Sequence, residues 1–178
     1  METFRDDVAL NAILYVARNM GERKDIHKIC KILYFADQAH LSRYGRNITG
    51  DTYIAMKYGP VPSHIYDLFK AVRTFSGAED FKTSYFYFSC SDPYLLIPVK
   101  EADLDYLSPS DIECLDEAIK KCSKKDFLSL TDLSHGYAWK NTVLNQQMST
   151  EDILHEVNDD ADYIAYISEK LKTEAALS

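Results

Sequence analysis

Apolar residues recur at intervals of three and four over most of the chain, a pattern typical of amphipathic helices. The strongest stripe runs through residues 24–44, and a shorter one precedes it in residues 6–19. A further stripe follows the Ser-Pro-Ser-Asp of residues 108–111, where serine and proline mark a helix start. Residues 126–134 are a candidate for a short helix. We therefore expect helices to make up most of the fold.

The C-terminal part of the chain leaves two arrangements open. Ser149-Thr150-Glu151-Asp152 resembles a helix cap, and the apolar residues from Ile153 to Leu171 follow it. They fit one face of a single helix, or two helices separated near Asn158-Asp159. We expect a single domain over residues 1–178, with the helical region 150–176 either part of it or an appendage.

Three segments have the composition of strands. Residues 52–58 precede a turn, and residues 84–89 and 94–99 flank the break at Ser91-Asp92-Pro93. The last two predict a hairpin, and together with 52–58 they would form a three-stranded sheet. The aromatic run Tyr85–Phe88 would place rings on both faces, one of them either covered by a helix or left as a binding surface. The predicted fold class is α+β and predominantly helical, with helices packed around a small antiparallel sheet of about three strands.

The stretch KYGPVPSHIYDLF, residues 57–69, reverses the chain sharply. Gly59 can take backbone angles that other residues resist, and Pro60 directs it away from helical geometry. Pro62 suits the first turn of a helix, where its missing N–H does little harm. We predict a rigid corner between the strand 52–58 and a helix that ends near residue 75.

Composition limits the function classes. The chain has 178 residues, 46% hydrophobic and 27% charged, which indicates a globular domain rather than a disordered one. Its net charge of -8 opposes nucleic-acid binding as the main role, because phosphate contacts need a basic surface. Four cysteines without a CxxC pair, no apparent signal peptide and no long apolar run lead us to expect a cytoplasmic protein with reduced thiols and no membrane partner.

Residues suited to chemistry are present but not in diagnostic patterns. His27 and Cys30 lie three apart, with His40 further along the same helix, and a metal would need two more ligands from elsewhere. A buried thiol and a hydrogen-bonded core histidine explain Cys30 and His40 more simply. Ser134-His135 is not a nucleophile elbow, and neither GxGxxG nor GxxxxGK[ST] occurs. We predict no catalytic residues, no metal, no cofactor and a non-enzymatic protein.

Four stretches, in order, resemble the Panacea domain, the SocA-like antitoxin family that is also seen in phage-associated proteins. They are HKICKILYFADQAHLSRYG, ITGDTYIAMKYGPVP, LSPSDIECLDEAI and LSHGYAWK, and the likeness extends over about residues 6–152. The resemblance implies a mostly helical antitoxin of a two-gene toxin–antitoxin pair, often carried on mobile elements. It implies a cognate toxin as partner, held by direct protein–protein contact, and in some members delivery of the toxin to a protease.

The same motifs supply the candidate site. Three residues follow one another at three-residue steps along one face of the second helix, four lie at the corner, and two lie in the last motif. They are Lys31, Tyr34, Asp37, Tyr58, Gly59, Pro60, Val61, His135 and Trp139. For the first three, toxin contact and internal packing are equally open, whereas Trp139 fits a core or domain-edge position better than a binding hot spot. A DNA-binding transcriptional regulator and, less favoured, an enzyme of unknown class are the alternative functions.

Overall fold

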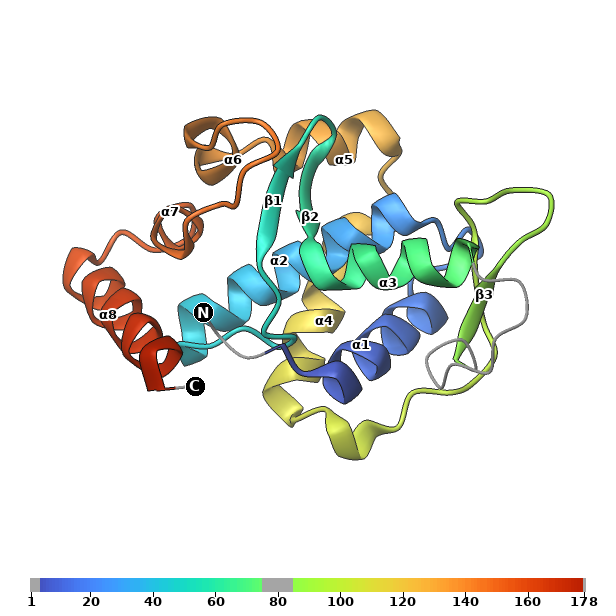
Figure 1. Ribbon diagram of the computed structural model, residues 1–178, viewed down its shortest axis with the longest axis horizontal. Coiled ribbons are helices and arrows are strands. Elements are labelled where there is room, and N and C mark those ends of the chain that lie inside the picture. Colours follow the sequence, from blue (N-terminus) through green and yellow to red (C-terminus); the bar gives the residue numbers. More distant parts are fainter. Residues whose placement is uncertain (1–3, 75–84, 178) are drawn as a thin grey trace.

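The computed structural model describes residues 4–74 and 85–177 as an α+β fold dominated by helices, as predicted (Figure 1). The helices are α1 (Asp6–Asn19), α2 (Ile26–Tyr44), α3 (Ser63–Thr74), α4 (Pro109–Cys122), α5 (Phe127–Ser134), α6 (Tyr137–Asn141), α7 (Thr150–His155) and α8 (Ala161–Leu177), with a short 3₁₀ helix at Leu104–Tyr106. The strands are β1 (Tyr53–Met56), β2 (Gly59–Pro62), β3 (Phe86–Phe88) and β4 (Leu96–Pro98). Helices α1, α2 and α5 begin and end within two residues of the expected positions, and α4 begins at the predicted serine–proline start.

Helix α2 is the centre of the molecule. It packs against α1, α4, α5, α7 and strand β2, and 13 of its 19 residues are buried. The carboxylate of Asp25 accepts a hydrogen bond from the Lys28 backbone N–H and caps its first turn, and Gly45 ends it with a φ of +67°. A helix covered on so many sides buries polar positions as well as its apolar stripe.

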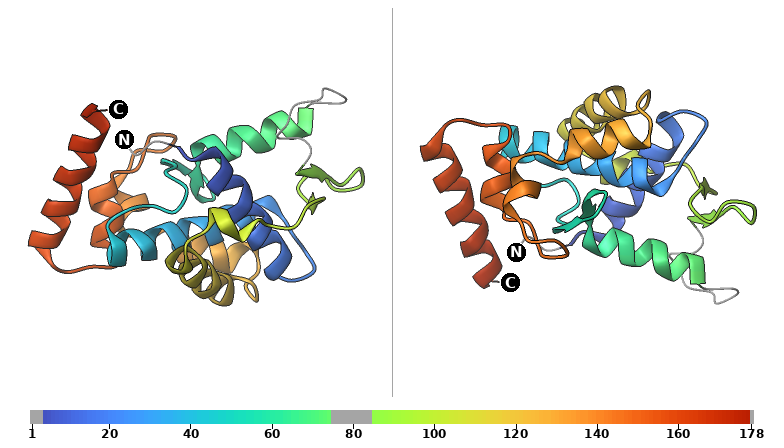
Figure 2. Two further views of the ribbon diagram at one scale, coloured as in Figure 1. Left: turned by 90° about the horizontal axis from the view of Figure 1, so that it is seen from below. Right: turned by 90° about the horizontal axis from the view of Figure 1, so that it is seen from above.

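The C-terminal region forms two helices rather than one. The chain leaves α7 after His155, and Asp160 caps α8 by accepting hydrogen bonds from the backbone N–H groups of Asp162 and Tyr163. Helix α8 then packs on the end of α2, where a Cβ added to Gly45 would lie 2.6 Å from Ile167 Cδ1. Figure 2 shows α8 at one end of the molecule and the β3–β4 hairpin at the other.

The prediction that the strand near residue 54 joins the 84–99 hairpin in one three-stranded sheet is wrong. β1 pairs with β2 in one two-stranded sheet, and β3 pairs with β4 in a separate antiparallel hairpin. Phe86 in β3 is buried against Phe69 of α3, so the aromatic hairpin packs on a helix rather than beside β1. The free edge of β1 is covered by residues 145–148, which exchange backbone hydrogen bonds with Tyr53 and Ala55.

The four aromatic residues of the predicted strand are divided between interior and surface. Phe86 is fully buried, Tyr85 and Phe88 are half-buried, and Tyr87 is 49% exposed. Phe88 also packs edge-on against Phe69 at 6.1 Å. The sequence analysis left undecided whether one aromatic face of this strand is a binding surface. In the structure the exposed part of that run is mainly Tyr87.

The predicted strand-to-helix corner is wrong in its geometry, because the chain makes a β-hairpin first. Met56 pairs with Gly59, so Lys57 and Tyr58 form the turn, and Gly59 follows it with a φ of +96°. β2 continues through Pro62, and α3 begins at Ser63. Ser63 N donates a hydrogen bond to Thr52 O, which fixes the register of the two strands. In this register a backbone N–H at residue 60 or 62 would point away from β1. The two prolines therefore remove no hydrogen bond between β1 and β2.

Candidate functional site

The β1–β2 hairpin is clamped to α2 by a buried lysine. Lys31 Nζ donates a hydrogen bond to the Pro60 carbonyl oxygen at 2.8 Å, and its side chain is fully buried. Burial lowers the pKa of Lys31 to about 8. A Cβ added to Gly59 would lie 2.8 Å from Lys31 Nζ and would overlap Ser134 Oγ. Glycine is therefore required at residue 59 both by the positive φ and by the closeness of α2 and α5.

Asp37 holds the base of the hairpin from the same helix. Its carboxylate accepts hydrogen bonds from Ile48 N (2.7 Å), Thr49 Oγ1 (2.9 Å) and Tyr53 OH (2.7 Å). Burial raises the pKa of Asp37, and these hydrogen bonds oppose that rise. The carboxylate thereby fixes the loop that enters β1 and the first residue of the strand.

Tyr34 joins α2 to the C-terminal part of the chain. Its ring meets the Tyr53 ring edge-on at 5.1 Å, and its hydroxyl donates a hydrogen bond to Glu156 Oε2 at 3.0 Å. The other carboxylate oxygen of Glu156 accepts from the Ala138 backbone N–H at 2.8 Å. One carboxylate just beyond α7 thus connects α2 with the start of α6.

Trp139 of α6 and His135 at the end of α5 support the tip of the hairpin. Trp139 Nε1 donates a hydrogen bond to the Met56 carbonyl oxygen at 2.9 Å. The His135 ring stacks on the indole with centroids 3.6 Å apart. Burial and the charge of Lys31 lower the pKa of His135. Trp139 is half-buried, which agrees with the domain-edge position expected for it.

The structure brings the nine sequence candidates together around one element. Each lies in the hairpin, contacts it, or stacks on a residue that does. Lys31, Tyr34 and Asp37 are at most 2% exposed, and their contacts support the internal-packing alternative. Tyr58, which is 48% exposed in the turn, is the candidate that presents a large side chain to solvent.

A groove of about 550 Å³ lies beside the hairpin tip. Its walls are largely apolar and aromatic, and they come from α2, the hairpin, α3, the turn before β4 and α5. The lining residues are Arg23, Asp25, Ile26, His27, Cys30, Lys31, Met56, Lys57, Tyr58, Val61, Tyr66, Tyr94 and Phe127. At its mouth the rings of Tyr58 and Phe127 meet at 5.1 Å, and Phe127 also lies 4.2 Å from His27.

Sequence reasoning missed Tyr66, Tyr94 and Phe127 as members of this site. Phe127 is 44% exposed at the start of α5 and Tyr94 is 58% exposed in a turn. The signal in the sequence is an aromatic residue placed off the buried stripe, which one sequence alone does not separate from chance exposure.

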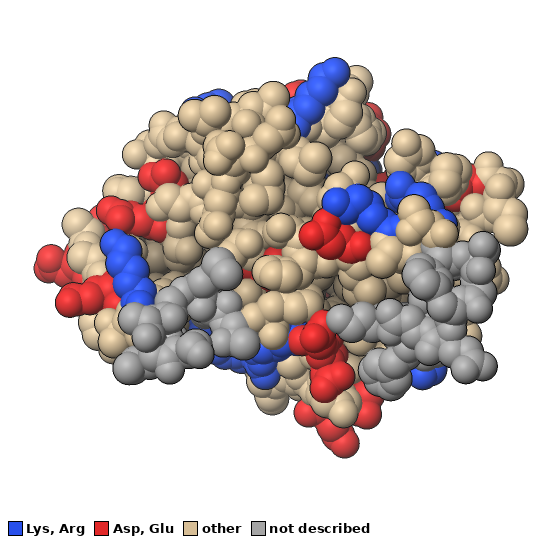
Figure 3. All heavy atoms as spheres, in the orientation of Figure 1, with Lys and Arg blue, Asp and Glu red and all other residues tan. Residues whose placement is uncertain are grey.

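One face of the hairpin and of α6 carries few charged side chains. Figure 3 shows a broad area without Lys, Arg, Asp or Glu side chains over β1, β2 and α6. The loop beyond α6 contains Val143 and Leu144, which are 74% and 50% exposed. This loop reaches the edge of β1, where the Asn145 backbone N–H donates a hydrogen bond to the Ala55 carbonyl oxygen. Exposed apolar side chains on an uncharged area are a feature of protein-binding surfaces.

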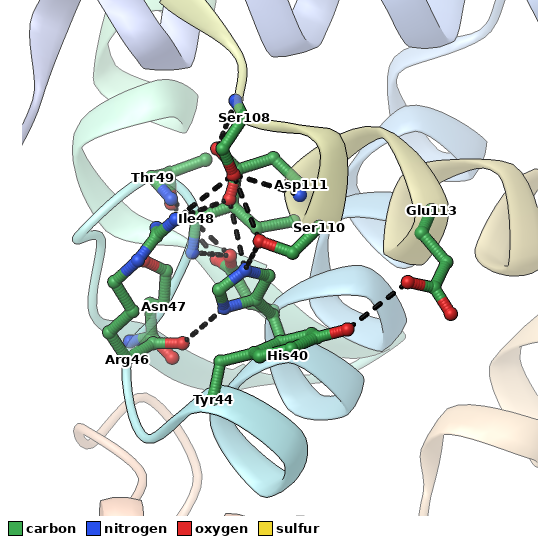
Figure 4. A network of polar contacts seen from close by, with 11 residues as sticks. His40, Tyr44, Arg46, Asn47, Ile48, Thr49, Ser108, Ser110, Asp111 and Glu113 are labelled. Atoms are coloured by element: carbon green, nitrogen blue, oxygen red, sulfur yellow. Dashed lines mark hydrogen bonds and ion pairs between the residues drawn. The ribbon is translucent and has the colours of Figure 1, made fainter.

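The sequence allowed His40 to be either a metal ligand or a core residue. In the structure its side chain is buried and both ring nitrogens have hydrogen-bond partners (Figure 4). Its ring nitrogens lie 2.9 Å from Arg46 O and 3.0 Å from Ser110 Oγ, and Arg46 pairs with Asp111 at 2.8 Å. Burial raises the pKa of Asp111, but hydrogen bonds from His40 and Ser108 and the Arg46 charge hold it below its usual range. Over residues 4–74 and 85–177, His, Cys, Asp and Glu side chains form no group suited to a metal ion.

The fold is a mostly helical domain built around a clamped hairpin, with a groove beside the hairpin tip. Residues 29–140, well over half of the chain, match the family model of the antitoxin SocA-like Panacea domain. The chain belongs to this family, which confirms the resemblance seen in its motifs. Neither the curated proteins nor the solved structures contain a match. In the described part of the chain, no helix has the length and apolar character needed to cross a membrane.

The family match ends before α7 and α8. These helices are nevertheless in contact with the matched part, since Glu156 accepts hydrogen bonds from Tyr34 and Ala138, and Ile167 packs against Gly45. Such contacts favour a C-terminal region that folds with the domain.

Proposed function

We propose that this protein is the antitoxin of a toxin–antitoxin pair and neutralises its toxin by direct contact at the groove and hairpin tip. One observation carries the location. Among the family-motif residues, Lys31, Tyr34 and Asp37 are buried where they hold the hairpin, and Tyr58 stands half-exposed at the mouth of the groove. The motif residues therefore build and position the surface, and the exposed aromatic residues contact the toxin.

The chemistry of the groove suits a protein partner. Aromatic side chains give large contact areas at little conformational-entropy cost, and apolar anchors seated in pockets carry much of the affinity of protein complexes. Tyr58 and Phe127 already contact each other, so their rings lose little further freedom on binding. Val143 and Leu144, in the loop that leads to the β1 edge, add exposed apolar area on the hairpin.

The alternative of a DNA-binding regulator receives no comparable support. The chain carries 20 basic and 28 acidic residues, so its overall field repels phosphate. Four lysines lie at or just beyond the end of α4: Lys120, Lys121, Lys124 and Lys125. Of these, Lys121 Nζ lies 3.8 Å from the centre of the Phe35 ring and is partly engaged in packing. We therefore propose no nucleic-acid partner.

The test is co-expression with the product of the neighbouring gene. Expression of that product alone should stop growth, co-expression should restore it, and the two proteins should co-purify as a stable complex. A neighbour that is not toxic, or a toxic neighbour that neither binds nor is neutralised, would contradict the proposal.

The same cells can separate occlusion from delivery to a protease. After translation is stopped, the toxin level is followed with and without this protein. A constant level alongside restored growth indicates occlusion of the toxin. A level that falls faster in the presence of this protein indicates that it acts as a proteolytic adaptor.

A further inference from the structure

The groove is locally basic in an acidic protein. Its lining contains three cationic side chains, Arg23, Lys31 and Lys57, but only one carboxylate, that of Asp25. The chain as a whole has a net charge of -8. The charge of the groove is therefore opposite in sign to that of the molecule.

Two of these cations lack an acidic partner among the described residues. Arg23 is balanced, because it pairs with Asp25 at 3.6 Å and with Asp92 at 3.0 Å. Lys31 and Lys57 form no ion pair with any carboxylate in the part of the chain that the structure describes. Lys57 is exposed and lies 5.1 Å from the centre of the Tyr58 ring, at the mouth of the groove. A carboxylate that approached Lys57 would thus pair with it without breaking an existing ion pair.

A third cation adds to the imbalance beyond Tyr94. The Arg73 guanidinium lies 5.2 Å from the Tyr94 ring and 4.8 Å from the Phe88 ring. Its Nε and one Nη are buried and have no hydrogen-bond partner among the residues that the structure describes, 4–74 and 85–177. Buried donors are normally satisfied, so an unpaired guanidinium behind the groove wall leaves a positive field on that side.

From this charge distribution we propose that the groove binds an acidic, apolar segment of the partner, in which a large apolar side chain is flanked by carboxylates. The apolar side chain lies against Tyr58, Val61 and Phe127, and a carboxylate pairs with Lys57 at the rim. Lys31 contributes its charge from beneath the floor. The inference rests on the proposed function, because it specifies which kind of toxin segment the groove holds.

The apolar walls decide against a bare anion as the occupant. A phosphate or a nucleic-acid backbone would use the cations but would leave the aromatic walls of the groove without contacts. An apolar segment without acids would bury the walls but would leave the positive charge of Lys57 and Lys31 uncompensated. Only a ligand with both features matches both properties of the site.

The experiment is an NMR titration of the full chain with three capped tripeptides, Ac-Asp-Phe-Asp-NH2, Ac-Asn-Phe-Asn-NH2 and Ac-Lys-Phe-Lys-NH2. The first two have the same shape and differ only in charge. We expect the acidic peptide to shift the resonances of His27 and Tyr58 and to bind at least about threefold more tightly than the amide peptide at low ionic strength, with the difference shrinking as salt rises. The basic peptide should bind most weakly.

Two variants locate the effect. Lys57→Gln should reduce the preference for the acidic peptide, whereas Lys120→Gln, an exposed lysine of α4 that does not line the groove, should leave it unchanged. Equal or weaker binding of the acidic peptide, or shifts confined to residues away from the groove, would overturn the inference. Such a result would not change the growth-rescue test of the proposed function, because that test uses the wild-type protein. If growth rescue failed while the acidic peptide still bound more tightly, only the proposed function would be overturned.

Discussion

The buried ammonium of Lys31 donates its hydrogen bond to the carbonyl of Pro60, 29 residues further along the chain, at a distance of 2.8 Å. Pro60 can offer this carbonyl outward because the opposite edge of β2 makes the ladder with β1. One interaction therefore connects the most buried part of α2 with the hairpin that forms the wall of the groove. It also places a positive charge in the interior, and no carboxylate of the described residues forms an ion pair with it.

Replacing Lys31 with methionine should change how stability depends on pH. The pKa of Lys31 is lowered from 10.5 to about 8 in the folded protein, so the unfolded chain holds more protons than the folded chain between these values. The Lys31 contribution to the free energy of unfolding therefore rises with pH, by about 2 kcal/mol between about pH 7 and about pH 10. Urea denaturation of the wild type and of Lys31→Met across this range measures the difference.

The comparison must be made between the two proteins, because buried thiols act in the opposite direction. Burial raises the pKa of Cys30 to about 12, and this stabilising contribution is lost as pH rises above the pKa of the unfolded thiol. The charge of Lys31 lowers the Cys30 pKa, so Lys31→Met raises that pKa further, but up to about pH 10 the buried thiol stays protonated in both folded proteins and its effect cancels in the difference. A difference that stays flat from neutral to alkaline pH would show that Lys31 is not desolvated as the structure indicates.

Gly59→Ala should destabilise the protein much more than Gly21→Ala. Both glycines have positive φ, +96° and +106°, so an alanine at either position is strained by about 1 kcal/mol. A Cβ at Gly21 meets nothing within 4 Å, whereas one at Gly59 overlaps Ser134 Oγ and crowds Lys31. We expect the second substitution to cost at least about 2 kcal/mol more, as measured by chemical denaturation.

Ser134 provides the control for that interpretation. If the serine oxygen causes the overlap, Ser134→Ala should recover part of the cost of Gly59→Ala, and the two substitutions should not be additive. Equal costs at Gly59 and Gly21 would mean that the backbone angle alone requires glycine in the hairpin.

Asp37→Asn should be tolerated better than Asp37→Ala. The Asp37 oxygen that faces Ile48 N and Thr49 N meets only donors, whereas the other meets the hydroxyls of Thr49 and Tyr53, which can also accept. An asparagine can therefore turn its oxygen to the backbone and its NH2 to the hydroxyls. We expect losses of about 1 kcal/mol for asparagine and about 3 kcal/mol for alanine in thermal or urea denaturation.

Exposed Asp132 on α5 serves as the matched position, where both substitutions should change stability by less than about 0.5 kcal/mol. An asparagine that costs as much as alanine at Asp37 would mean that the ionised carboxylate itself is needed to order the loop before β1.

The helices were predictable because their signals are local. The three- and four-residue spacing from Ile26 to Leu41 and the serine–proline start at Ser108 each specify an element within one stretch of chain. The β1–β2 hairpin was misjudged because Pro60 and Pro62 resemble strand breakers, although an edge strand accepts them. The partner of β1 at residues 145–148 is held by backbone hydrogen bonds and carries no strand pattern that a sequence could reveal.

The candidate site was likewise predictable from the sequence only in part. Family motifs identified the residues that hold the hairpin, including Lys31 and Asp37, but not whether they face the interior or the surface. That distinction depends on α2 being covered by helices that follow it by many residues. The groove itself joins Tyr58, Tyr94 and Phe127 from three distant segments, and such a meeting is set by the tertiary fold rather than by any local spacing.

Tyr58→Ala and Phe127→Ala should separate binding from folding. Each ring is nearly half-exposed, and the two meet edge-on at 5.1 Å, so either truncation should cost less than about 1 kcal/mol of stability. As anchors in the toxin interface each should weaken the complex about tenfold or more, with growth rescue lost first in the double variant. Tyr166→Ala is the matched control, since Tyr166 is 65% exposed on α8 and does not line the groove. Calorimetry of toxin binding with thermal melts of each variant measures both quantities. A double variant that folds and binds like the wild type would place the toxin elsewhere, and an equal loss with Tyr166→Ala would place α8 within the interface.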